Sequence, residues 1–239
     1  MSDPMSGPMS DPRRVLAAAR YQVALLARSQ RWLPPLVLLG VVLVTATEGS
    51  PPAADAFGFA AAGLLPSVAW LTRAALAVEP GPARAVLSAA VGTGRAQVSA
   101  LLAALLAALL FALVGTGVVA VLVLASGARG ADRAQPAPTD LAAVIGAGLV
   151  AQLVSAGVGL AIGALCSPPV LRPPALAVLT AGCAVVLGLV APASPAVNAL
   201  HGLTGPQPTI GWLPLLGAGL LIVVAAAGSV TAARRRAPS

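Results

Sequence analysis

Residues 96–128, AQVSALLAALLAALLFALVGTGVVAVLVLASGA, form a segment without a single Asp, Glu, Lys or Arg. A helix that crosses the hydrocarbon core of a bilayer needs roughly 20 apolar residues. Four more uncharged segments lie around this one, at 32–47, 56–72, 141–171 and 173–233. Only 9% of the 239 residues are charged and 58% are hydrophobic, whereas about a quarter are charged in a typical soluble domain. The composition therefore predicts an all-α, polytopic integral membrane protein.

The uncharged segments predict six transmembrane helices. The last segment is too long for one helix, and several prolines and glycines between Pro192 and Pro208 interrupt it, because these residues break helices. The predicted spans are residues 32–48, 56–72, 98–125, 141–166, 174–191 and 210–231. The stretch from Pro195 to Leu203 could form short half-helices that dip into the membrane where other parts of the protein bury them. An even number of spans places both termini on one side.

The arginines predict which side that is. Twelve of the fourteen basic residues fall on one face of the predicted topology, and only Arg129 and Arg133 fall on the other. Because cytoplasmic loops carry an excess of Lys and Arg, both termini are expected in the cytoplasm. Residues 1–12 are expected to be disordered, and residues 13–236 to form a single transmembrane domain.

The residue inventory excludes several functions. Lysine is absent, so the chain lacks the lysine of a phosphate-binding P-loop and is not expected to be its own ATPase. One histidine, His201, and two cysteines, Cys166 and Cys183, cannot build an HExxH or structural zinc site. We therefore predict no catalytic, cofactor or metal site and no enzymatic activity. The net charge of +7 reflects topology rather than nucleic-acid binding, because the arginines lie between long apolar runs.

Residues 13–31 have the periodicity of an amphipathic helix. Its predicted apolar face consists of Val15, Leu16, Ala19, Val23 and Leu26. Its opposite face consists of Arg13, Arg14, Arg20, Arg28 and Arg31. The pattern predicts an interfacial helix in the headgroup plane, with the arginines toward water and lipid phosphate. A basic juxtamembrane segment without defined orientation is the alternative.

A second amphipathic helix is predicted at residues 82–91, between the second and third spans. Pro82 suits a first helical position and Gly92 suits a helix end. Val86, Leu87, Ala90 and Val91 are expected on one side, with Arg84 and Ser88 on another. A rigid apolar ridge with charged flanks suits docking into a groove of another protein. The candidate docking residues are Glu79, Arg84, Val86, Leu87, Val91 and Arg95.

The fourth predicted span carries small residues every four positions, at Ala151, Ser155, Gly159 and Gly163. Such spacing lets helix backbones approach closely, either between subunits or within one bundle. Gln152 lies near mid-depth and needs a hydrogen-bond partner on a neighbouring helix, or it lines a substrate path. No Asp, Glu or Arg lies in the predicted membrane core, which argues against a proton-coupled transporter.

This layout resembles the permease subunit of type-2 ABC exporters. Residues 20–33, RYQVALLARSQRWL, are similar to the entry of actinobacterial members, and residues 157–167, GVGLAIGALCS, precede a similar proline-rich turn. The resemblance covers residues 13–236 and rests more on the order of spans and amphipathic helices than on residue identities. It implies that residues 79–95 contain a coupling helix that contacts a separate ATPase subunit, where ATP binds. The low charge of this segment departs from the family's pattern.

The resemblance also implies an outer hairpin at 192–209 and a homo- or heterodimer of permeases in the plasma membrane. Two other functions are the alternatives to a permease. A membrane-embedded enzyme is disfavoured, because such enzymes need clustered His, Asp, Glu or Lys residues. A non-transporting membrane subunit or scaffold of another complex stays open.

Overall fold

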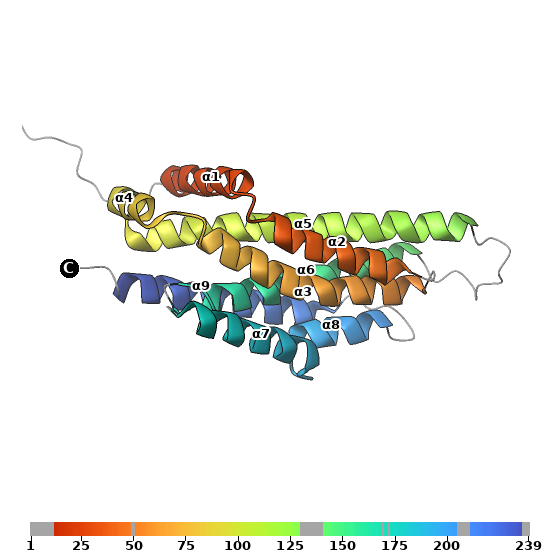
Figure 1. Ribbon diagram of the computed structural model, residues 1–239. Coiled ribbons are helices and arrows are strands. Elements are labelled where there is room, and N and C mark those ends of the chain that lie inside the picture. The colour runs from red at the N-terminus through yellow and green to blue at the C-terminus, as the bar shows by residue number, and fades with distance from the viewer. Residues whose placement is uncertain are drawn as a thin grey trace, which may run out of the picture.

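The computed structural model describes residues 12–48, 51–129, 141–168, 170–171, 173–204 and 211–235. Within these residues the chain forms helices and no strands (Figure 1). The helices are α1 (Pro12–Arg28), α2 (Leu33–Thr47), α3 (Ala53–Leu76), α4 (Gly81–Val91), α5 (Thr93–Arg129), α6 (Leu141–Leu165), α7 (Pro174–Val190), α8 (Pro195–Thr204) and α9 (Trp212–Arg235). The predicted all-α class is therefore confirmed.

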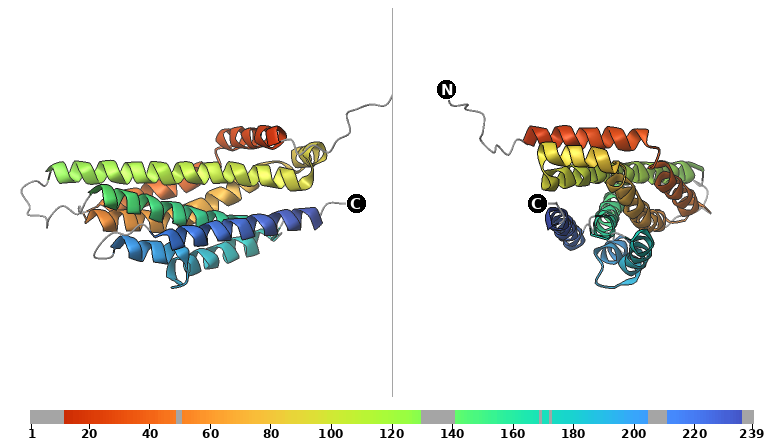
Figure 2. Two further views of the ribbon diagram at one scale, coloured as in Figure 1. Left: turned by 180° about the vertical axis from the view of Figure 1, so that it is seen from behind. Right: turned by 60° about the vertical axis from the view of Figure 1, so that its left-hand side comes forward.

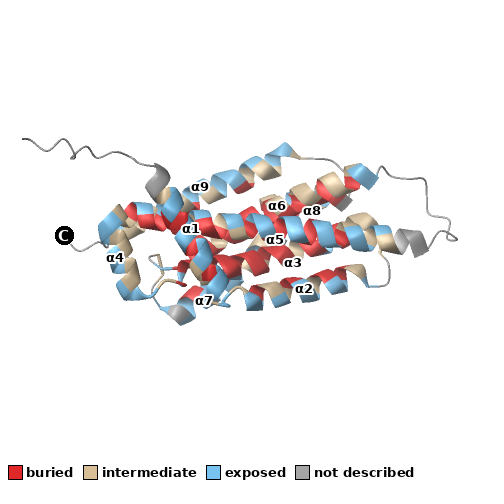
Figure 3. Ribbon diagram, turned by 90° about the horizontal axis from the view of Figure 1, so that it is seen from above, coloured by how far each residue is buried: buried red, intermediate tan, exposed pale blue. Residues whose placement is uncertain are grey.

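The long helices lie along one common axis, and α3 and α6 occupy the middle of the bundle (Figures 1 and 2). In the most apolar stretch of each span, more than half of the residues are buried in α3 and in α6. The buried share is only 11% in α7 with α8 and 17% in α9. Phe57, Leu64, Leu65 and Val68 of α3 are fully buried, as is Val154 of α6. Figure 3 shows buried residues along these helices and along one side of α5. The outer helices leave their apolar side chains exposed, as helices that face lipid do.

In the part of the chain that the structure describes, five segments are long and apolar enough to cross a membrane, and six if α1 and α2 count as one bent span. The chain is thus a multi-pass membrane protein. α2 has 15 residues, which corresponds to about 22 Å and is shorter than the roughly 30 Å of a hydrocarbon core. The predicted first span at 32–48 is therefore a helix where expected but is short on its own. The axes of α1 and α2 differ by 71° across the break between them.

The fifth predicted span continues further than expected. After a break at Ala191–Ser194 the chain re-enters a helix, α8, and Ala175–Leu203 counts as one candidate span. Figure 1 shows α8 running onward in the direction of α7. Ser194 stabilises the break, because its Oγ donates to Gly188 O at 2.6 Å and accepts from Ala196 N at 3.3 Å. The prolines thus interrupt the helix without reversing the chain between Ala191 and Thr204, and the rest of the predicted outer hairpin at 192–209 lies outside the described residues.

Both ends of the described chain, Pro12 and Arg235, lie at one end of the bundle, together with α1 and α4 (Figures 1 and 2). This end also receives the last turn of α3 with Arg73 and the last turn of α9 with Arg234. We call it the arginine-rich end. Glu48 and Asp55 lie at the opposite end, where α2 ends and α3 begins. The structure of Arg133, Arg172 and Arg236 is outside the described residues.

Candidate functional site

The helix α4 stands outside the bundle at the arginine-rich end (Figure 1). It has 11 residues, none of which is buried. Pro82 lies in its first turn, and Gly92 ends it with φ at 88°, a backbone conformation that glycine adopts without steric cost. Its bounds match the predicted helix at 82–91 to within one residue. None of its residues is buried, so its outer side stays exposed at this end of the molecule.

The two sides of α4 differ from the predicted faces. Val86 is 71% exposed, and Ala90 is also exposed, whereas Leu87 and Val91 are half-buried. Successive helical residues are 100° apart, so Leu87 and Val91 share a side with Arg84 and Ser88. The single apolar ridge expected from the sequence is therefore wrong. Instead, one side packs toward α5 and the other presents Val86 to the exterior.

Arg84 links α4 to two other helices. Its Nη2 donates to Gln97 Oε1 of α5 at 2.8 Å, and its Nη1 lies 3.5 Å from Leu76 O at the end of α3. Gln97 is 1% exposed. The guanidinium predicted to contact a partner is thus engaged within the chain. Arg95, another predicted docking residue, is exposed near the start of α5.

Glu79 is also used within the chain. Gln22 of α1, which is 3% exposed, donates from Nε2 to Glu79 Oε2 at 2.9 Å. Arg31 Nη1 donates to Ala77 O at 2.6 Å in the same link between α3 and α4. These bonds attach α1 to the segment that enters α4. Gln22 and Gln97 are not among the predicted site residues, although a lone amide on an otherwise apolar helix face is a signal for such a contact.

Replacing Arg84 with methionine should loosen α4 while retaining an unbranched apolar side chain in place of the arginine stem. The substitution removes the charged hydrogen bond to Gln97, which we expect to contribute about 1.5 kcal/mol. Hydrogen exchange of the α4 amides should then be roughly tenfold faster. Arg95→Met is the matched control, because Arg95 is exposed. Equal exchange rates in the two variants would contradict a stabilising role of Arg84.

The helix α1 lies across the bundle axis rather than along it (Figure 2). Ala18, Ala19, Gln22 and Leu26 are buried and form the side that packs against α5. Of the predicted apolar face, Leu16 and Val23 are instead 54% and 38% exposed. The predicted single apolar face is therefore divided between α5 and the exterior. Arg20, Arg28 and Arg31 are exposed, and the side chains of Arg13 and Arg14 are outside the described residues.

The small residues of α6 lie against α3 of the same chain. A Cβ atom placed on Gly159 would lie 2.5 Å from Leu65 O, and one placed on Gly163 would lie 2.7 Å from Ala69 O. No side chain fits at such separations, so these glycines permit the close contact of the two helices. Ser155 and Gln152 on the same side of α6 are completely buried. The structure thus shows these residues in packing within one bundle.

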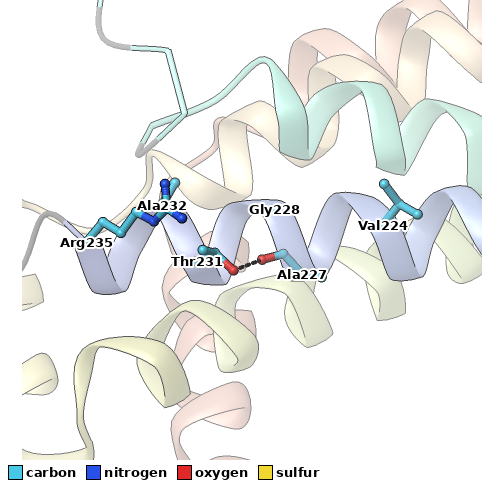
Figure 4. Close-up of a pocket in the computed structure, with 6 residues that line it drawn as sticks. All are labelled: Val224, Ala227, Gly228, Thr231, Ala232 and Arg235. Carbon is cyan, nitrogen blue, oxygen red and sulfur yellow. Dashed lines mark hydrogen bonds between the residues drawn. The ribbon is translucent and has the colours of Figure 1, made fainter.

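The surface of the described residues is hollowed at both ends of α9. An open groove of about 640 Å³ follows α9 from Val224 to Arg235 and includes Gly228 and Thr231 (Figure 4). A second, of about 540 Å³, lies between α6, α8 and α9 at the opposite end and is lined in part by Asn198 and Trp212. Within the described part of the chain, no three His, Cys, Asp or Glu residues gather as metal ligands would.

The remaining chemically distinctive residues lie apart from one another. His201 is exposed on α8, Cys166 is buried just after α6, and Cys183 is exposed on α7. The candidate site is therefore α4 with the polar contacts around it. Comparison of the chain with family models, with curated proteins and with solved structures finds no match in any of the three.

Proposed function

We propose that this chain is the membrane-spanning permease subunit of an ATP-driven ABC exporter in the plasma membrane. It would form the substrate path and couple to a separate ATPase subunit that binds ATP. The observation that carries the proposal is α4, a short helix between two spans that stands outside the bundle and has no buried residue. The concentration of arginines at the same end supports a cytoplasmic location for α4 and both termini.

The docking surface in this proposal is the exposed side of α4, with Val86 at its centre, and it includes the exposed Arg95 near the start of α5. An amphipathic helix that inserts its apolar side into a groove is a common mode of protein recognition. Glu79 and Arg84 then act inside the permease, because their polar atoms are bonded to Gln22 and Gln97. Their role is to carry a movement of α4 to α1 and α5 rather than to contact the ATPase.

The long helix α5 is suited to transmit such a movement. Its 37 residues correspond to about 55 Å, so it extends from α4 to the opposite end of the bundle. The sparse burial of α7, α8 and α9 leaves apolar surface that lipid or a second permease can cover. A homo- or heterodimer of permeases is part of the proposal on the family resemblance.

Purification of the intact chain from its native membranes tests the function. We expect an ATPase subunit to copurify, and ATP hydrolysis in the sample to depend on that subunit. Mass spectrometry of the purified complex and an ATPase assay give the two readouts. A stable complex that contains other membrane or cytoplasmic proteins and has no ATPase would instead favour the scaffold function.

A further inference from the structure

Buried polar side chains follow the contact between α3 and α6. Gln152 and Ser155 lie near the middle of α6, and Thr72 lies near the end of α3; all three are 0% exposed. Both amide atoms of Gln152, the Oγ of Ser155 and the Oγ1 of Thr72 have no hydrogen-bond partner among the residues that the structure describes. Nearly all buried polar groups in proteins have a partner. Four such unpartnered atoms lie along one helix contact, and the other three in the described residues, Gln22 Oε1, Glu79 Oε1 and Gln97 Nε2, lie around α4.

Other buried hydroxyls of the bundle behave differently. Ser67 Oγ donates to Gly63 O at 2.9 Å, Thr116 Oγ1 donates to Ala112 O at 2.8 Å, and Ser167 Oγ donates to Gly163 O at 2.6 Å. A hydroxyl in a helix can thus donate a hydrogen bond to a backbone carbonyl on the preceding turn of the same helix. Ser155 and Thr72 do not do so, although the same local bond is available in a helix. Their hydroxyls are left for a group outside their own helices.

The unpartnered atoms lie along one seam. Gln152, Ser155 and Gly159 are spaced by three and four residues, so they share a side of α6. A Cβ atom placed on Gly163 would lie 2.6 Å from Thr72 Cβ, which puts Thr72 on the same contact closer to the arginine-rich end. Gln152 also reaches α5, because a Cβ atom placed on Gly115 would lie 2.6 Å from its Oε1. We define the α3–α6 seam by Thr72, Gln152 and Ser155.

The chemistry of the seam selects its ligand. An amide and two hydroxyls offer both donors and acceptors but no charge. α6 has no Asp, Glu, Lys or Arg along its whole length, so a charged group would find no counter-charge on it. The matching ligand is an uncharged hydrogen-bonding group, such as water or the hydroxyl, amide or carbonyl group of an otherwise apolar solute.

We infer that the α3–α6 seam is a binding site for uncharged hydrogen-bonding groups, which enter from the arginine-rich end when α3 and α6 separate. Water is the first such ligand. That a transported solute also binds there rests on the proposed function, whereas the entry of water does not. The close approach of Gly159 to Leu65 O closes the seam in the present structure. Thr72 is then the first contact on entry and Gln152 the last.

Cysteine labelling in native membranes tests this inference. Cys166 and Cys183 are first replaced by alanine, and Ser155→Cys is compared with Ala156→Cys, the adjacent residue, which is 3% exposed. N-ethylmaleimide reacts with a thiolate, which forms where water reaches the sulfur. We expect Ser155→Cys to react at least tenfold faster than Ala156→Cys. Equal, slow reaction at both positions would overturn the inference.

Two further variants identify the residues that admit water. Adding Gln152→Leu to Ser155→Cys should lower the labelling rate to that of Ala156→Cys, and an unchanged rate would overturn the role of Gln152. If Ser155→Cys does not accumulate in the membrane, Thr72→Cys is compared with Leu71→Cys, since both native residues are almost fully buried. These measurements need no ATPase, so they can fail or succeed independently of copurification.

Discussion

Replacing Gly159 with alanine should sharply lower the stability of the bundle. The new Cβ atom would lie 2.5 Å from Leu65 O and 3.2 Å from Ala69 N, which are backbone atoms and cannot rotate away. α3 and α6 would have to separate at the centre of the molecule, and overpacking of this kind typically costs about 1–3 kcal/mol. We expect a clear decrease in the Tm of the protein in detergent and a smaller amount of folded protein in the membrane.

Gly182→Ala in α7 is the matched control for this substitution. A Cβ atom placed on Gly182 would meet no atom within 4 Å among the described residues apart from its chain neighbours and its own helix backbone, and the residue is exposed. Alanine is favoured over glycine in a helix by about 1 kcal/mol, so this variant should be unchanged or slightly more stable. Similar Tm values for the two variants would contradict the close backbone contact between α3 and α6 at Gly159.

The positions of the helices could be predicted because the cost of placing a charge in the hydrocarbon core decides them. Charge is costly in the hydrocarbon core, so an uncharged run such as 141–171 indicates a span directly, and α6 begins at the predicted residue. Proline and glycine mark the ends of α4 equally directly, because they act on the backbone itself. These signals are local and need no knowledge of the neighbouring helices.

The direction of the chain after a break and the orientation of each side chain depend on contacts with other helices, so the local sequence does not decide them. The prolines at 192 and 195 predicted an interruption, but only the packing of α8 against α6 and α9 fixes that the chain continues instead of turning back. Likewise, the sequence pattern of α1 places Leu16 and Leu26 on the same apolar face, yet of these two only Leu26 packs against the core. The use of Arg84 inside the chain depends on Gln97, 13 residues away, and no periodicity of α4 reveals it.

Replacing Val86 with aspartate should abolish copurification of the proposed ATPase subunit. Val86 is 71% exposed on a helix without buried residues, so the substitution leaves the internal contacts of the bundle intact. In a complex, however, it would place a charge in the apolar groove that receives α4. Loss of a central contact typically costs about 2 kcal/mol or more, which corresponds to a roughly thirtyfold weaker Kd.

Ala24→Asp in α1 controls for the added charge. Ala24 is exposed at the same end of the molecule and lies one turn from both Arg20 and Arg28, so an aspartate there gains favourable pairs along the helix. This variant should keep the partner, while both variants should retain the Tm of the native chain. If Val86→Asp keeps the partner at native levels, the exposed side of α4 is not the docking surface. If both variants lose it, the effect comes from charge at this end of the protein and not from a groove that receives Val86.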